Sequence, residues 1–172
     1  MNAGLSLAYS RRYRDVLTPA AVSLERLLRS YCWDCPGIGR ISARAKGVER
    51  FLAKAASEVA GKGARYLAPL EQIQDQISVQ IVVFHASDVE RVSHVVERYF
   101  RWREATMMAP DVSCAPSAFG KRYVLELPDD VLPPSIVRND APEVFELQIG
   151  GGYINCLGRS RTTISAIRLL PP

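Results

Sequence analysis

The sequence predicts an α/β (α+β) protein, because segments with the 3.6-residue period of a helix alternate with segments rich in β-branched residues. Two helix-like segments come before the most apolar run, residues 77–84, and a third comes directly after it. Two stretches of strand-like alternation follow at residues 123–127 and 144–149. Such an order is typical of a sheet with helices packed on it.

The composition is that of one folded domain. The chain has 172 residues, of which 48% are hydrophobic and 23% are charged, which suits a single core and argues against disorder. No run approaches the roughly 20 apolar residues of a membrane span, and residues 1–10 lack the layout of a signal peptide. We therefore expect a cytoplasmic protein without a membrane partner.

The first half of the chain predicts two helices. The first spans residues 15–32, with Thr18 as the N-cap and Pro19 at the first helical position. Residues 34–41 contain one proline and two glycines and are expected to form a loop. The second helix is predicted from residue 48 to residue 59, where glycines follow.

The centre of the chain predicts a strand followed by a helix. Residues 77–84 are β-branched on both faces, which is typical of a central strand. Ser87 and Glu90 have the spacing of a capping box, and apolar residues then recur at helical spacing as far as Phe100. We expect a helix to begin at this box.

The last predicted strand brings polar side chains together. Phe145, Leu147 and Ile149 alternate with polar residues, so they are expected to face the core. Glu146 and Gln148 then share the opposite face, where they can serve chemistry.

The net charge and the cysteine content do not identify a function. The formal charge of +4, from 22 basic and 18 acidic residues, suits a polyanionic ligand without identifying one. Cys32 and Cys35 form a Cys-x-x-Cys pair, which could be half of a zinc site or a redox motif. Because no second pair accompanies it, Cys32, Cys35, Cys114 and Cys156 are expected to be free thiols.

Basic and acidic residues form the candidate site. Arg44, Lys46 and Lys54 cluster around the start of the second predicted helix, where a helix N-terminus favours an anion, although such residues are also common on solvated surfaces. Asp75 directly precedes the apolar strand and Glu146 lies within another. Mg²⁺ is usually held by one or two carboxylates together with phosphate oxygens and waters, so these residues are candidate metal ligands.

Three segments in this order resemble one family. They are Ser42 to Lys54, with Arg44, Lys46 and a second lysine eight residues later; Pro69 to Ile77, which contains Asp75; and Phe145-Glu146-Leu147-Gln148-Ile149. In order and spacing they are similar to the synthetase domain of the RelA/SpoT alarmone family, and the similarity spans residues 42–149.

The resemblance implies a nucleotidyltransferase-like mixed sheet of about five strands flanked by helices, in a domain over residues 1–149. It implies transfer of pyrophosphate from ATP to the 3′-hydroxyl of GDP or GTP, with Mg²⁺ as cofactor. The residues it assigns are Arg44, Lys46 and Lys54 to the ATP phosphates, Asp75 and Glu146 to metal binding and catalysis, and Gln148, Lys121 and Arg122 to the acceptor. His85 and His94 match no family position and are expected to be structural.

The chain also departs from the family. Ser78 and Gln80 stand where the family has Gly and Arg, so a guanidinium near the transferred group is missing. The acceptor-loop Tyr and His are absent around residues 119–125, with or without an alignment gap. Residues 150–172 have no counterpart and are expected to form an atypical, mobile tail, for which an interrupted reading frame is one explanation.

Three functions follow as hypotheses. The first is an alarmone synthetase of weak or absent activity. The second is a non-catalytic, nucleotide-binding descendant. The third is a toxin-type pyrophosphokinase that acts on adenosine nucleotides or on tRNA; otherwise no nucleic acid is expected. The sequence leaves open whether the chain forms a homo-oligomer.

Overall fold

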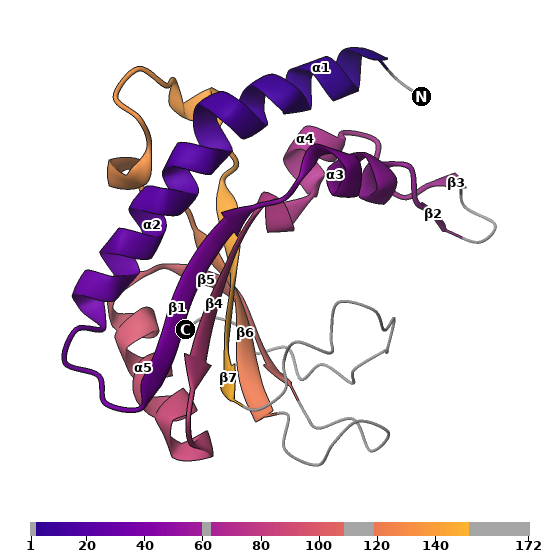
Figure 1. The fold of residues 1–172 in the computed structure, drawn as a ribbon. Coiled ribbons are helices and arrows are strands. Elements are labelled where there is room, and N and C mark those ends of the chain that lie inside the picture. The colour runs from indigo at the N-terminus through magenta and orange to yellow at the C-terminus, as the bar shows by residue number, and fades with distance from the viewer. Residues whose placement is uncertain (1–2, 60–62, 109–118, 152–172) are drawn as a thin grey trace.

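Five strands form one mixed sheet in the computed structural model, which describes residues 3–59, 63–108 and 119–151 (Figure 1). The strand order is β1-β4-β7-β6-β5; β4 and β7 run parallel, and the other neighbouring pairs run antiparallel. The strands are β1 (Ile38–Ala45), β4 (Ile77–Val83), β5 (Trp102–Met108), β6 (Phe119–Glu126) and β7 (Val144–Gly151). The predicted mixed sheet flanked by helices is confirmed.

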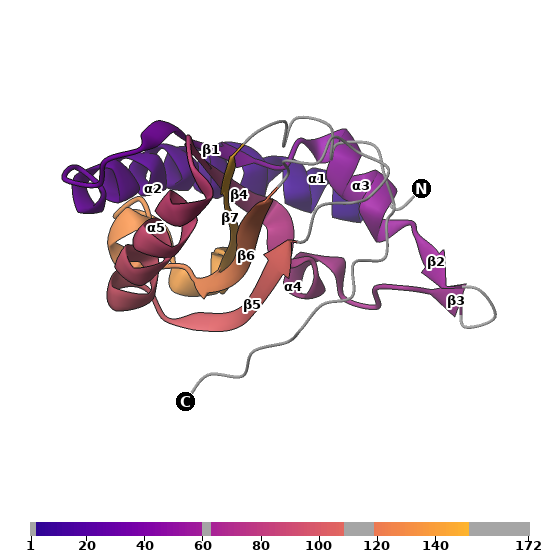
Figure 2. The same ribbon diagram turned by 90° about the horizontal axis from the view of Figure 1, so that it is seen from below.

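Two helices cover one face of this sheet. Helix α2 (Thr18–Tyr31) packs on β1 and β4, and α5 (Ala86–Tyr99) packs on β4, β6 and β7. Figure 2 shows both on the same side of the curved sheet. The alternation predicted for β4 and β7 is confirmed, since the apolar residues of one face are buried in this core: Ile77, Val79, Ile81, Val83, Phe145, Leu147 and Ile149.

The N-terminal helix begins earlier than predicted. Helix α1 (Ala3–Arg12), a π-helical turn (Tyr13–Leu17) and α2 follow one another without a break, so Thr18 is not an N-cap. Its Oγ1 instead donates a hydrogen bond to the Tyr13 carbonyl at 2.8 Å. Because Pro19 has no N–H for the carbonyl four residues earlier, the chain widens into a π turn ahead of it rather than starting a new helix.

Strand β1 occupies part of the segment predicted as a loop, residues 34–41. Its outer edge contacts α2 rather than another strand: the Ala43 N–H donates to Glu25 Oε2 at 2.9 Å, and an Arg29 N–H donates to the Ile41 carbonyl at 2.6 Å. These side-chain bonds protect an exposed sheet edge. An edge strand buries few side chains, which explains why its sequence carries no strong strand pattern.

The helix after β1 is shorter than predicted. Helix α3 runs over Val48–Ala55, and Glu58–Val59 (β2) then pairs with Gly63–Ala64 (β3) in a small ribbon that projects from the domain (Figure 1). Helix α4 (Pro69–Gln72) and a 3₁₀ turn (Gln74–Gln76) lead into β4. Arg44 therefore lies in β1 rather than at the helix opening, whereas Lys46 directly precedes Gly47, the N-cap of α3, as predicted.

Other differences concern ends and edges. The N-cap of α5 is His85, whose N–H donates to Asp88 Oδ2 at 3.2 Å, so the predicted box at Ser87 and Glu90 is two residues late. Strand β5 was not predicted, since in it only Ala105 is buried. Strand β6 begins at Phe119, before the expected Tyr123, and ends at Glu126.

Two short 3₁₀ turns, Asp129–Val131 and Arg138–Asp140, connect β6 to β7. Strand β7 continues through Gly150 and Gly151. The rest of the expected tail, with Cys156, lies outside the described residues, as does Cys114 between β5 and β6. Among the helices described, none is both long and apolar enough to cross a bilayer.

Candidate active site

A row of polar residues crosses the sheet on the face opposite α2 and α5. Arg44 of β1 pairs with Ser78 of β4, and Ser78 pairs in turn with Glu146 of β7. Residues paired across neighbouring strands point to the same face, so these three side chains line up. The predicted sharing of one face by Glu146 and Gln148 is confirmed, because Gln148 Nε2 donates a hydrogen bond to Glu146 Oε1 at 2.7 Å.

The second predicted carboxylate, Asp75, is held by two lysines. Lys46 Nζ and Lys54 Nζ each lie 2.9 Å from Asp75 Oδ2. Asp75 Oδ1 is buried and has no hydrogen-bond partner among the described residues. The structure thus brings together three residues that the sequence predicted for one site, from the β1–α3 connection, α3 and the turn before β4.

The charge state of Asp75 follows from this arrangement. Burial is the largest single influence and by itself would raise the pKa of its carboxyl group, but the hydrogen bonds and positive charges of Lys46 and Lys54 together outweigh burial and hold that pKa below its usual value. Asp75 is therefore an ionised carboxylate at neutral pH. With two ammonium groups around one carboxylate, the cluster carries a net positive charge.

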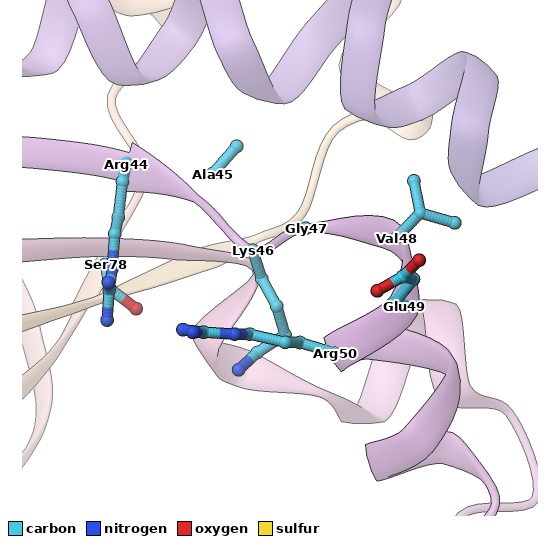
Figure 3. Close-up of a pocket in the computed structure, with 8 residues that line it drawn as sticks. All are labelled: Arg44, Ala45, Lys46, Gly47, Val48, Glu49, Arg50 and Ser78. Atoms are coloured by element: carbon cyan, nitrogen blue, oxygen red, sulfur yellow. The ribbon is translucent and has the colours of Figure 1, made fainter. Parts of the chain in front are cut away.

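A pocket of about 390 Å³ opens beside this cluster (Figure 3). Figure 3 shows Arg44, Lys46 and Arg50 extending to one side of the chain, while Ala45 points away from them. The other lining residues are Gly47, Val48, Glu49 and Ser78. The first residues of α3 contribute to the wall, so a helix N-terminus adds to the positive potential of the pocket.

Arg50 was missed by the sequence analysis, although a signal for it existed. Lys46, Arg50 and Lys54 recur every four residues, and on a helix that spacing places side chains on one face. Arg50 is exposed and forms no ion pair in the described structure.

Residues of α1 hold the backbone of the site. The Tyr9 hydroxyl donates to the Lys46 carbonyl at 2.7 Å, and the Tyr9 ring stacks on Phe51 of α3 with centroids 3.6 Å apart. Burial, and secondly Asp75, raise the pKa of Tyr9, so its hydroxyl stays a donor. The Lys46 N–H donates to the Gln76 carbonyl at 2.8 Å. The backbone of Lys46 is thereby tied both to α1 and to the turn that carries Asp75.

Arg12 ties α1 both to α4 and to the same turn, since its guanidinium donates to the Leu70 carbonyl at 2.8 Å and to Gln76 Oε1 at 3.4 Å. The buried Gln76 side chain donates to the Leu70 and Ile73 carbonyls at 2.8 and 3.0 Å. No local pattern in the sequence marks Tyr9 or Arg12 as site residues, because their partners lie far along the chain.

The predicted acceptor residues are divided between the two faces of the sheet. Arg122 pairs with Gln148, and its guanidinium lies 3.6 Å from Glu146 Oε2. Lys121 instead faces α5, where it is 8% exposed and its Nζ lies 3.0 Å from Glu97 Oε1. The structure therefore does not bring Lys121 together with Arg122 and Gln148, because consecutive residues of a strand point to opposite faces.

The carboxylates fit a magnesium ion that arrives with phosphate. In the described ranges, no group of three or more His, Cys, Asp or Glu residues could hold a metal ion by itself. Asp75 and Glu146 offer hard oxygen ligands, and Asp75 Oδ2 already attracts two cationic groups. Mg²⁺ takes one or two carboxylates and completes its shell with phosphate and water, so a protein cage is not needed.

Cys32 and Cys35 are free thiols, and burial raises the pKa of Cys32 to about 12.

No protein-family model matches the sequence, and no curated protein matches it. Solved structures do match. A GTP pyrophosphokinase family protein from Streptococcus pneumoniae is 18% identical with a TM-score of 0.60, over 91% of this chain and 73% of that one. Small alarmone synthetase 1 from Bacillus subtilis is 18% identical with a TM-score of 0.56, over 86% and 72%.

A second structure of the Bacillus subtilis protein, bound to its product pppGpp, has a TM-score of 0.50 at 18% identity, over 83% of this chain and 70% of that one. At such identity the likeness establishes the fold. The five-stranded mixed sheet with its flanking helices is therefore the fold of the GTP pyrophosphokinases and small alarmone synthetases, as the resemblance of the sequence implies.

Proposed function

We propose that this chain binds ATP with Mg²⁺ and transfers the β,γ-pyrophosphoryl group to the 3′-hydroxyl of GDP or GTP, with AMP as the leaving group. The observation that carries the proposal is the cluster of Lys46, Lys54 and Asp75 beside a basic pocket, on a fold shared with pyrophosphokinases. A site for this chemistry needs cations for a polyphosphate and carboxylates for a metal, and both kinds of group are present.

The donor would bind in the pocket. Arg44, Lys46 and Arg50 supply positive charge on its wall, and the first N–H groups of α3 lie beside them. Phosphoryl-type transfer depends mainly on positioning and on neutralising charge, and these groups provide both. Lys54 would join them by leaving Asp75 for a phosphate oxygen.

The metal would lie between the donor and the carboxylates. Bound there, Mg²⁺ would neutralise phosphate oxygens and favour the departure of the leaving group. Asp75 and Glu146 are the residues of this chain that would hold it. Asp75 lies directly before β4, and Glu146 lies on β7 beside β4.

Glu146 is also suited to accept the proton of the attacking hydroxyl. Its Oε1 is oriented by Gln148 at 2.7 Å, and its Oε2 lies 3.6 Å from Arg122. A base must be held in position to act, and these two neighbours provide that. Gln148 and Arg122 would contact the acceptor, whereas Lys121 is engaged with Glu97 on the other face.

The deciding experiment is incubation of the full chain with ATP, GDP and Mg²⁺, followed by anion-exchange separation of the nucleotides. We expect guanosine tetraphosphate from the wild type and none from Glu146→Gln, while Glu126→Gln, an equal change on neighbouring β6, should keep activity. Complete absence of product at high enzyme concentration would contradict the proposed turnover.

One observation favours a second candidate, a nucleotide-binding protein without turnover. Gln80 of β4 pairs with Gln148 of β7. The family has an arginine at the position of Gln80. An amide cannot supply the charge of a guanidinium to the transition state. Calorimetric titration with a non-hydrolysable ATP analogue separates the candidates, since binding without product is the result expected for this one.

A further inference from the structure

Neither oxygen of the Asp75 carboxylate is open to a metal ion in the free protein. Oδ2 has two ammonium groups at 2.9 Å, from Lys46 and Lys54, and a metal ion would have to compete with both for this oxygen. Oδ1 is buried and faces no donor among the described residues. A cation that approaches this residue alone must therefore displace a lysine.

We propose that Lys46 and Lys54 guard Asp75 against free divalent cations, so that the chain takes up a metal only together with a polyphosphate. The inference rests on the proposed donor site and adds the order in which that site fills. It assigns the lysines a role in the free protein as well as in the complex.

The positive charge around Asp75 supports this proposal. The two ammonium groups outweigh the single carboxylate, and Arg44 and Arg50 add positive charge in the adjoining pocket. A free dication meets net repulsion at such a place. A polyphosphate meets attraction, and phosphate oxygens offer the lysines a partner that carries more charge than one carboxylate. When a lysine moves to phosphate, Oδ2 becomes free for the metal that the polyphosphate brings.

Backbone hydrogen bonds hold Lys46 in its position beside Asp75. Lys46 is tied through its carbonyl to Tyr9 and through its N–H to Gln76, next to Asp75. The Lys46–Asp75 contact therefore cannot open by a backbone shift without breaking these bonds. Lys54 comes from α3, and its side chain is 36% exposed against 18% for Lys46. Lys54 is thus the lysine that leaves Asp75 first.

Manganese binding to the full chain without nucleotide tests the guard. We expect free Mn²⁺, followed by electron paramagnetic resonance, to bind wild type weakly and Lys54→Met on the order of tenfold more tightly, because one lone pair of Oδ2 is released. Arg50→Met is the matched control: it removes one positive charge from the same helix, α3, at a residue that lines the adjoining pocket and forms no ion pair with Asp75. Adding Asp75→Asn to Lys54→Met should abolish the gain.

Two results would overturn the proposal: wild type that binds Mn²⁺ as tightly as Lys54→Met, or a gain in Arg50→Met equal to that in Lys54→Met. Thermal melting checks that each variant is folded, and Lys46→Met replaces Lys54→Met if the latter is not.

A second, metal-free test measures what it costs a polyphosphate to draw the lysines away from Asp75. In the presence of EDTA, inorganic tripolyphosphate should bind Asp75→Asn about tenfold more tightly than wild type, because the lysines no longer have to leave a carboxylate. Equal or weaker binding by Asp75→Asn contradicts the guard. Neither test uses turnover, so failure of the proposed synthetase activity would leave both results interpretable.

Discussion

The Tyr9 hydroxyl donates a 2.7 Å hydrogen bond to the backbone carbonyl of Lys46, 37 residues further along the chain. The same ring stacks almost parallel on Phe51, with an angle of 4° between the planes. Helix α1 therefore contacts both the backbone and the helix that carry the lysines around Asp75. It contributes to the site without supplying a residue that faces the pocket.

Tyr9→Phe should test this support. The variant keeps the stacked ring but leaves the Lys46 carbonyl without its donor, which we expect to cost about 1–2 kcal/mol in the free energy of unfolding. The affinity for an ATP analogue should fall as well, because Lys46 is less well held. Urea unfolding and calorimetry measure the two effects. Tyr13→Phe is the control, and an equal loss there would mean that the Lys46 bond has no special role.

Acid should remove stability that the Asp75 ion pairs contribute. Because the pKa of Asp75 is lowered on folding from 3.8, its contribution is present above that value and is lost as the pH falls through the lower folded pKa. The free energy of unfolding should therefore decrease between pH 5 and more acidic conditions, by less in Asp75→Asn than in wild type. Urea titrations across this range measure the difference. Asp130→Asn, on an exposed turn, should follow wild type; identical curves for all three proteins would contradict the assignment.

Two adjacent residues of β6 should behave differently when changed to methionine. Lys121→Met removes the partner of Glu97 beneath α5 and should lower stability by about 1–2 kcal/mol, with little effect on the acceptor KM. Arg122→Met should leave stability nearly unchanged and raise the acceptor KM. Chemical denaturation and steady-state kinetics separate the two effects. If Lys121→Met, and not Arg122→Met, raised the acceptor KM, Lys121 would be an acceptor-binding residue after all.

The turn between α2 and β1 depends on Gly37. Its φ of 84° lies in the left-handed region, and a side-chain carbon there would clash with the Asp88 carboxylate that caps α5. Gly37→Ala should therefore cost roughly 1–3 kcal/mol in unfolding free energy. Gly47→Ser is the comparison, since Gly47 has a φ of −56° as the N-cap of α3 and open space around it. Denaturation midpoints that drop equally in both variants would argue against backbone strain at Gly37.

Central strands were predicted well from the sequence, and edge strands were not. In β4 and β7 every second residue is buried, so the period of two is visible in the letters themselves. Strands β1 and β5 each bury a single side chain fully, Ile41 and Ala105, and their polar residues hide the pattern. Thr18 and Pro19 predict a helix start from sequence alone, because the π turn that accommodates the proline has no signature in the sequence.

The candidate site divides in the same way. Alternation was enough to put Glu146 and Gln148 on one face, and the position of Asp75 ahead of β4 could be predicted from where the apolar run begins. The same alternation separates Lys121 from Arg122, but only the pairing of β6 with β7 decides which of the two faces α5.

The contacts of Asp75 with Lys46 and Lys54, and the support from Tyr9, arise from tertiary structure alone. They join residues that lie between 21 and 37 positions apart in the chain, and they form only when α1 and α3 pack against the turn before β4. A local sequence pattern reports the face on which a side chain lies. It carries no information on the partner that another segment brings to that face, because that depends on packing energy summed over the whole core.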